Sequence, residues 1–325
     1  MKKILFAVCI VVIMLLTGCS EKYVASVGDK KISESEFSFY LNSIKSQMSG
    51  TELQSEEDWK RQEIEGMKAI DFAKERALEA AAVNVAYIEI AKALDIELTD
   101  EDEEYIKSTK KSIVSSRGGE NGYKEYLKEN AITDDFIEML CESMIYSTKL
   151  AEKAITESPV TDEEKAEIFS ELSVYGNYKA KHILFSVVDG ETMQPLDDET
   201  VKNAKNKAEE VLGRVKKGED FDALMHEYSE DPGLATSPDG YVFSSGEMVP
   251  EFESCVAGLE FNSVGFTESQ FGYHIIKRLP LDITDLEKQI ESKITEDRLL
   301  TALDKWRNEF SLSTVKNDVV FNEIS

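Results

Sequence analysis

Histidine, cysteine and basic residues are scarce in this chain. Its 325 residues include 3 His and 4 Cys, and 37 Lys and Arg stand against 64 Asp and Glu, for a formal net charge of −27. A field of that sign repels nucleic acid, so we expect no nucleic-acid partner. Hydrophobic residues still make up 42% of the chain, which is ordinary for a globular protein.

The chain begins with an apolar run that is too short to span a bilayer. Residues 4–16 are uninterrupted apolar residues after Lys2 and Lys3, as in a secretory signal peptide, whereas a spanning helix needs about 20. The next residues, Leu-Thr-Gly-Cys at 16–19, resemble the lipobox of bacterial lipoproteins. This resemblance implies cleavage after residue 18 and lipid, such as palmitate, on Cys19. We therefore expect a lipid anchor in the cell membrane, with the folded part on its extracytoplasmic face. An ordinary signal peptide is the alternative.

Few cysteines are left for structural use. Cys9 lies in the predicted signal peptide and Cys19 is the predicted lipid site, so Cys141 and Cys255 remain. Two cysteines are too few for a disulfide framework, and both lie in helical patterns, where buried free thiols are common. A single bridge between them stays open at this point.

Helical patterns dominate both ends of the chain. Ser/Thr-x-x-Asp/Glu patterns predict capping boxes at Ser33/Glu36, Thr99/Asp102, Thr161/Glu164 and Thr284/Glu287. Apolar spacing predicts that residues 33–172 are nearly all helical, with one long helix over 56–94. Residues 284–310 return to helix. This lone C-terminal helix cannot bury its apolar face alone, so we expect it to pack on the N-terminal helices.

The middle of the chain has a different character. Strands are predicted at 178–188 and 271–279, with helices at 197–217, 221–228 and 250–259 between them. The predicted class is α+β, with this mixed α/β domain inserted into an all-α domain made of the N- and C-terminal helices. The predicted boundaries are 1–18 for the signal peptide, 19–172 for the anchor and N-terminal domain, 173–281 for the inserted domain and 282–325 for the C-terminal segment.

Four stretches of this middle segment, in order, resemble the parvulin-type peptidyl-prolyl isomerases. They are KAKHILF around His182, FDALMHEYSEDP, GEMVPEFE, and FGYHIIK around His274. The resemblance implies that His182 and His274 face each other across the central strands and that Asp231 lies beside the reacting amide. It also implies that Ser269 hydrogen-bonds the histidine pair. A histidine on an apolar strand face can instead be a satisfied core residue, and Asp231 can simply cap a turn.

The same resemblance implies an apolar pocket for the proline ring. Met248 and Phe252 would hold the ring, and Phe271 and Phe243 would complete the pocket wall. The loop SPDGYVF at 237–243 departs from the glycine-rich sequence of many relatives, which leaves the alignment of Tyr241 open. Rotation about an imide breaks no covalent bond, so the reaction requires no nucleophile, cofactor or metal. We read His226 as a helix surface residue, because no two histidines have metal-ligand spacing.

The helical flanks carry a second resemblance. VASVGDKKISESEFSFYL and AKALDIELTDEDEEYI are similar to the chaperone segment of SurA-like parvulins, and with the lipobox the whole architecture resembles the PrsA family of foldase lipoproteins. It implies an extracytoplasmic foldase that isomerises X-Pro bonds in secreted proteins and holds unfolded clients; a homodimer stays open. Methionines that suit an adaptable client groove, although such residues are more often core, are Met48, Met67, Met139 and Met144.

Two other functions can be weighed against this one. The first is a non-catalytic holdase lipoprotein whose parvulin domain is only a scaffold, and this alternative stays open. The second is a solute-binding lipoprotein of a transporter. It requires two α/β lobes, whereas residues 33–172 are predicted to be helical, so this class is excluded.

Overall fold

A computed structural model describes residues 22–50, 53–174 and 176–324. The chain forms two units, one made of Met1–Ser158 with Arg298–Ser325 and the other of Pro159–Asp297. The predicted signal peptide and Cys19 lie outside the described residues. Within the part of the chain that is described, no helix is both long and apolar enough to cross a membrane.

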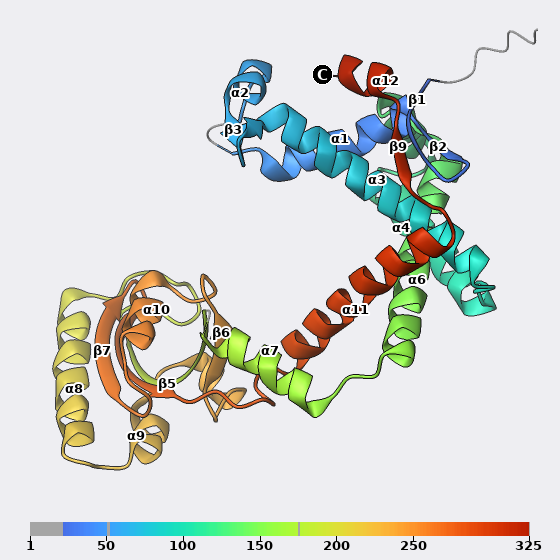
Figure 1. The fold of residues 1–325 in the computed structure, drawn as a ribbon. Helices are drawn as coiled ribbons and strands as arrows, with labels where there is room; N and C mark the ends of the chain where they lie inside the picture. The colour runs from blue at the N-terminus through green and yellow to red at the C-terminus, as the bar shows by residue number, and fades with distance from the viewer. Residues whose placement is uncertain (1–21, 51–52, 175, 325) are drawn as a thin grey trace, which may run out of the picture. The chain divides into compact units, whose positions relative to one another are not determined.

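The first unit is mainly helical (Figure 1). Its elements in chain order are β1 (Tyr23–Val27), β2 (Lys30–Ser33), α1 (Glu34–Met48), α2 (Glu56–Arg61), β3 (Glu63–Ile64), β4 (Met67–Lys68), α3 (Ala69–Ala93), α4 (Asp100–Ser116), α5 (Glu120–Glu129), α6 (Asp134–Glu157), the C-terminal part of α11 (Glu287–Glu309), β9 (Thr314–Lys316) and α12 (Asp318–Glu323). The helix starts are set locally: complete capping boxes form at Ser33 and Thr99, as predicted.

The end of the chain completes the core of the first unit. Strand β9 pairs antiparallel with β1 in a sheet of order β2-β1-β9. Trp306 is 1% exposed and shares one hydrophobic core with Phe37 of α1 and Phe321 of α12. The mixed α+β class is confirmed, and the first unit adds a small sheet to the all-α arrangement that helical spacing predicted.

Two local predictions in the helical flanks are wrong. The continuous helix over 56–94 is broken by a hairpin of β3 and β4, because Glu65 and Gly66 adopt positive φ values of 52° and 79° and reverse the chain. The predicted helix start at Thr284 is also wrong. The Thr284 hydroxyl donates to Asp282 at 2.5 Å, and α11 begins only at Glu287. Of the four methionines assigned to a groove, Met67 and Met144 are exposed, whereas Met48 and Met139 are half-buried against the core.

The middle unit is built around a four-stranded antiparallel sheet of order β6-β5-β8-β7 (Figure 1). Its elements are α7 (Asp162–Val174), β5 (Asn177–Ser186), α8 (Asp198–Lys216), α9 (Phe221–Tyr228), a 3-10 turn η1 (Pro232–Ala235), β6 (Tyr241–Ser244), α10 (Pro250–Ala257), β7 (Val264–Ser269), β8 (Gly272–Leu279) and the start of α11. Residues of α8 and α9 form one core with the sheet, and residues of α10 form another.

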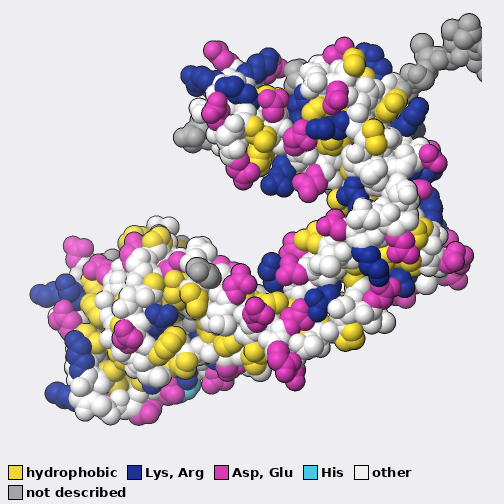
Figure 2. Space-filling view, viewed as in Figure 1, with side chains coloured by type: hydrophobic (Ala, Val, Ile, Leu, Met, Phe, Trp, Pro, Cys, Tyr) yellow, Lys and Arg dark blue, Asp and Glu magenta, His cyan; other side chains and the backbone are white. Residues whose placement is uncertain are grey.

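The middle unit is longer than the predicted span of 173–281. Ile168 of α7 packs in one cluster with Leu286, which directly precedes α11, and with Ile290 and Ile294 of α11. Residues 159–172 and 282–297 therefore belong to this unit. Helical periodicity alone does not indicate which core a helix face contacts, and α11 contributes to both units. On the face shown in Figure 2, acidic side chains are spread among basic ones over each unit rather than gathered in one patch.

Candidate active site

Two strand histidines meet on the face of the sheet that α10 covers. In the β5–β8 ladder His182 lies opposite Ile276, and His274 lies opposite Leu184. Alternate residues of a strand share a face, so the two histidines are diagonal neighbours within reach of each other. Their Nδ1 atoms are 3.1 Å apart, and their rings are nearly parallel, with an interplanar angle of 10°. The expected pairing of these two residues is what the structure has.

A continuous chain of polar contacts runs through this pair. Nε2 of His182 lies 3.1 Å from Oδ2 of Asp231, which comes from the turn before η1. At the other end, Nε2 of His274 lies 2.7 Å from the Ser269 hydroxyl. The same hydroxyl accepts a hydrogen bond from the Phe271 backbone amide at 3.1 Å. The four residues predicted to form the catalytic set therefore lie in one connected line.

The direction of each hydrogen bond follows from Asp231. An ionised carboxylate can only accept, so Nε2 of a neutral His182 donates to it and its Nδ1 accepts. Nδ1 of His274 then donates, and its Nε2 accepts from the Ser269 hydroxyl. With both imidazoles neutral, every nitrogen in the line has a partner of the correct kind, which fixes both tautomers.

The acid–base properties of the site agree with this direction. Burial alone would raise the pKa of Asp231, but hydrogen bonds from His182 and Tyr241 outweigh it and lower the pKa to about 2. Burial, followed by the nearby His182, lowers the pKa of His274 to about 4, although Asp231 acts in the opposite sense. Near neutral pH the site thus holds a carboxylate and a neutral His274.

Tyr241 was left open by the sequence and proves to be part of the line. Its hydroxyl donates to Oδ2 of Asp231 at 2.5 Å, and burial followed by this contact raises the pKa of Tyr241. The other oxygen, Oδ1 of Asp231, accepts from the Gly233 amide at 3.2 Å. Asp231 therefore caps its turn and also joins the histidines, so the two interpretations of this residue are compatible. The sequence feature that could have indicated this role is the glycine, Gly240, directly before the aromatic residue that begins β6.

Beside this line lies an apolar cavity of about 530 Å³. It is lined by Met248, Phe252 and Phe271, together with Leu184 and Val249. Met248 precedes α10, where Pro250 begins the helix. The Phe252 ring is nearly perpendicular to both imidazoles, with interplanar angles of 90° for His182 and 80° for His274 and centroid distances of 5.2 Å and 5.6 Å. The predicted pocket residues are thus gathered around one cavity, with a single exception.

Phe243 is that exception. It is 3% exposed and is not among the residues that line the cavity. Its ring packs against Phe252 at 5.9 Å and against Tyr178 at 5.5 Å. Phe243 therefore supports Phe252 from behind, because its place in β6 directs its side chain into the core under α10.

The charged residues around the cavity are all acidic. Glu230, Asp231 and Glu247 line it, and none of the lysines and arginines in the described part of the chain does. Glu230 accepts from the Ser186 amide and Glu247 from the Ser244 amide, both at 2.7 Å, so backbone contacts hold both carboxylates in place.

The remaining candidate residues lie apart from the cavity. His226 is exposed near the end of α9, as expected for a surface residue. Cys141 and Cys255 are both free thiols. Among the residues that the structure describes, no group of three or more His, Cys, Asp or Glu side chains is placed to hold a metal ion.

Sequence comparisons identify the middle unit. The model of the PPIC-type peptidyl-prolyl isomerase domain matches residues 167–279. A foldase protein PrsA of Caldanaerobacter subterraneus is 28% identical over 309 residues, which cover 90% of this chain and 88% of the relative. A second foldase protein PrsA, from Halalkalibacterium halodurans, is 32% identical over 238 residues, covering 71% of this chain and 66% of the relative.

Solved structures of the same name are also similar to this chain. PrsA of Bacillus subtilis is 21% identical with a TM-score of 0.30, and the match covers 89% of this chain and 91% of that one. PrsA of Streptococcus pneumoniae is 17% identical with a TM-score of 0.36, covering 93% and 98%. The sequence matches carry the assignment: the chain has a parvulin-type peptidyl-prolyl isomerase domain and belongs to the PrsA family of foldases.

Proposed function

We propose that the protein is a membrane-anchored foldase that isomerises X-Pro bonds in secreted proteins on the extracytoplasmic side and also holds unfolded clients. The observation that carries the catalytic part is the polar line from Tyr241 through Asp231 and the two histidines to Ser269, which borders an apolar cavity. In this proposal Met248 and Phe252 hold the proline ring while the imide rotates.

The energetic demand on such a site is modest. Rotation about the peptide bond has a barrier of about 18–20 kcal/mol because resonance gives the C–N bond partial double-bond character. A thousandfold acceleration requires only about 4 kcal/mol of stabilisation of the transition state. An apolar cavity that holds the proline ring in a twisted geometry, together with a few fixed dipoles, can supply a stabilisation of this size, so no covalent step is needed.

Asp231 supplies a charge of the useful sign. A planar imide carries excess negative charge on its carbonyl oxygen, and this charge falls as the bond twists and resonance is lost. A carboxylate held near that oxygen therefore repels the planar state more than the twisted one, which lowers the barrier. His182 and Tyr241 fix the position of the carboxylate, and His274 with Ser269 fixes His182. In this mechanism the histidines position Asp231 and transfer no proton.

Exchange NMR with the full-length protein tests the catalytic part. Cis/trans exchange of a proline tetrapeptide is measured with wild type, Asp231→Ala and Asp231→Asn. We expect both variants to lose at least tenfold in exchange rate, since Asn keeps the shape but removes the charge. A wild-type rate in Asp231→Asn would exclude the electrostatic role. If the wild type itself gave no acceleration, while it still suppressed aggregation of an unfolded protein, the non-catalytic holdase would be the better description.

The proposed anchor rests on the residues Leu-Thr-Gly-Cys at 16–19. One methylene contributes about 0.8 kcal/mol on burial, and two or more acyl chains hold a protein stably on a membrane. The test is metabolic labelling with radioactive palmitate in a bacterial host, followed by membrane fractionation. Cys19→Ala should lose the label and leave the membrane fraction. Unchanged labelling of that variant would exclude Cys19 as the lipid site.

A further inference from the structure

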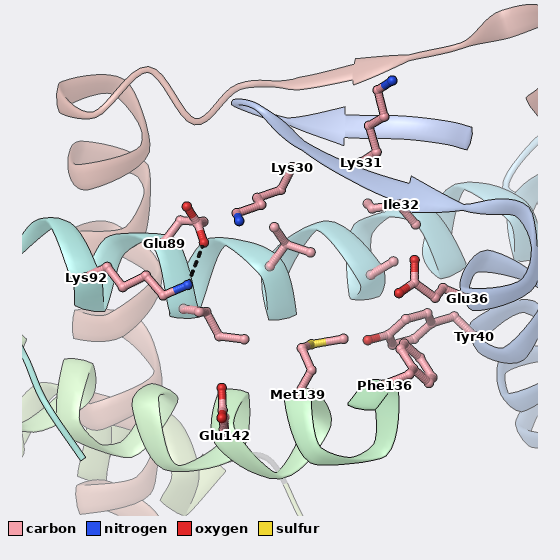
Figure 3. A pocket seen from close by; sticks show the side chains of 13 residues that line it. Lys30, Lys31, Ile32, Glu36, Tyr40, Glu89, Lys92, Phe136, Met139 and Glu142 are labelled. Atoms are coloured by element: carbon pink, nitrogen blue, oxygen red, sulfur yellow. Dashed lines mark hydrogen bonds and ion pairs between the residues drawn. The ribbon is translucent and has the colours of Figure 1, made fainter. Parts of the chain in front are cut away.

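The first unit contains a pocket that the isomerase reaction does not use. It has a volume of about 230 Å³ and is formed by β2, α1, α3 and α6. Figure 3 shows its walls: Ile32 reaches it from β2, Tyr40 from α1, and Phe136 and Met139 from α6. All of these elements belong to one unit, so the shape of the pocket depends only on the packing within that unit.

One buried polar atom in this pocket lacks a partner. Tyr40 is 8% exposed as a residue, and its hydroxyl makes no hydrogen bond among the described residues. The nearby Asn84 amide instead donates to the Ala80 carbonyl at 2.9 Å, and its oxygen accepts from Ser143 at 2.6 Å. Burial raises the pKa of Tyr40 and Glu36 adds to this shift, whereas the Asn84 side chain, which lies near the hydroxyl but outside hydrogen-bond geometry, opposes it. The hydroxyl therefore keeps its proton and can donate.

The Tyr40 ring cannot easily turn to find a partner elsewhere. It packs edge-to-face on Phe136, with centroids 5.9 Å apart, and on Phe39, at 6.0 Å. Figure 3 shows the hydroxyl pointing along the pocket toward Met139. A buried donor without a partner costs about 1–3 kcal/mol, and an acceptor brought in by a ligand removes that cost.

The remaining walls suit a large apolar side chain. Ile32, Ala81, Val85, Ile88 and Met139 line the pocket around the tyrosine. A cavity of about 150 Å³ already accommodates benzene, so this pocket has room for a phenyl ring. Met139 is half-buried and has three rotatable bonds, which lets that wall adapt to side chains of different shapes.

The rim of the pocket favours an uncharged segment. Its charged residues balance, with the three lysines Lys30, Lys31 and Lys92 and the three glutamates Glu36, Glu89 and Glu142. The chain as a whole has a net charge of −27, but this balance leaves the pocket without a net charge that would attract or repel a charged segment. Strand β2 borders the pocket and pairs only with β1 among the described residues, so an extended backbone can lie along its other edge.

We propose that this pocket binds a large apolar side chain, phenylalanine above all, of an extended and unfolded polypeptide, whose backbone carbonyl accepts the hydrogen bond of the Tyr40 hydroxyl. The inference rests on the proposed client-holding function and gives it a defined subsite. It requires no proline in the client, so binding here is separable from the isomerase site.

The test uses the full-length protein with 13C-methyl methionine, whose Met139 signal is assigned with Met139→Leu. The probes are the proline-free peptides Ac-Ala-Phe-Ala-NH2 and Ac-Ala-Ala-Ala-NH2. We expect the phenylalanine peptide to shift the Met139 signal in a saturable manner and the alanine peptide to leave it unchanged. Tyr40→Phe should weaken binding about fivefold, which corresponds to one neutral hydrogen bond.

A filled pocket provides the second variant. Val85→Phe should abolish the Met139 shift, whereas Val319→Phe, which adds the same ring to an exposed site on α12, should preserve it. Fluorescence of Trp59 and Trp306, which are buried in this same unit, confirms that each variant is folded. Wild-type binding in Val85→Phe, or an affinity unchanged in Tyr40→Phe, would overturn the proposal. Neither result would affect the isomerase or aggregation assays, so failure of the subsite is distinguishable from failure of the proposed function.

Discussion

The hydroxyl of Tyr241 and Nε2 of His182 meet at the same oxygen, Oδ2 of Asp231, at 2.5 Å and 3.1 Å. This shared contact leaves the carboxylate little freedom, because its second oxygen is tied to the backbone amide of Gly233. Tyr241 is therefore a positioning residue for Asp231. It contributes to the site without touching the imide in the proposed mechanism.

We expect Tyr241→Phe to lower kcat/KM for a proline peptide about tenfold while the fold is kept. The lost hydrogen bond has a charged acceptor, and such a bond contributes about 1.5–3 kcal/mol. A loss of about 1.4 kcal/mol in transition-state stabilisation already lowers the rate tenfold. With one donor fewer, the pKa of Asp231 should rise toward its usual 3.8, so the acidic limb of the pH–rate profile should move to higher pH.

The control for this variant is Tyr228→Phe. The Tyr228 hydroxyl accepts from Arg214 at 2.8 Å and is not among the residues that line the cavity. Its loss should change neither kcat/KM nor the pH profile. An unchanged acidic limb in Tyr241→Phe would show that the tyrosine plays only a packing role.

Gly233 provides a second route to the same contact. A Cβ atom at Gly233 would lie 2.1 Å from the Tyr241 oxygen, so the hydroxyl reaches Asp231 only because this residue has no side chain. Gly233→Ala should reduce kcat/KM about as much as Tyr241→Phe, and the double variant should be no worse than either single one. Gly213→Ala is the control, since its Cβ would meet nothing within 4 Å. Additive losses in the double variant would contradict this explanation.

The line from Asp231 to Ser269 could be anticipated only in part from the sequence. Period-two alternation places His182 and His274 on a common face once β5 and β8 pair, and four motifs in series indicated that pairing. The role of Tyr241 could not be read in this way, because it depends on a close approach across Gly233 in a loop of unusual sequence. Phe243 was wrongly assigned to the pocket wall for a related reason. The sequence places it in a strand, but only the position of α10 shows that its side chain packs in the core behind Phe252 and does not line the cavity.

The helical flanks show a second limit of what can be predicted from the sequence. Periodicity identifies an apolar face but not its partner, so α11 was assigned wholly to the N-terminal helices, although Leu286 and Ile290 pack with α7. Strand β9 was missed because three residues carry too little pattern to predict a strand. The pocket at Tyr40 has no signal in the sequence, since it arises from four elements that come together only in the folded unit.

His274 should make the middle unit less stable in mild acid. Its pKa is lowered from 6.5 to about 4 in the folded state, so between these values the unfolded chain binds a proton that the folded chain does not. The stabilisation is complete above pH 6.5 and is lost progressively as the pH falls toward 4. At about 1.36 kcal/mol per pKa unit this amounts to roughly 3 kcal/mol.

The measurement needs a probe in the correct unit. Trp59 and Trp306 both lie in the first unit, so tryptophan fluorescence would not report on β8. Urea unfolding of the middle unit can be followed at pH 7 and pH 5 through NMR signals of β8, and NMR titration of the imidazole of His274 gives its pKa directly. An apparent pKa of His274 near 6.5 would remove the basis of the expected loss. His274→Gln should flatten the dependence of stability on pH in this range.

The acidic rim of the isomerase cavity predicts a preference for the residue before proline. Glu230 and Glu247 are exposed there, and no basic residue that the structure describes lines the cavity, so Lys-Pro peptides should be isomerised faster than Glu-Pro peptides. One contact between unit charges at 4 Å is worth about 1 kcal/mol in water, which corresponds to a ratio of about fivefold. Because salt screens exposed charges, the ratio should fall toward one at 1 M NaCl.

Glu247→Gln, which keeps the acceptor for the Ser244 amide, should lower the ratio without affecting the rate for Leu-Pro. Equal rates for Lys-Pro and Glu-Pro at low salt would show that these carboxylates do not reach the substrate.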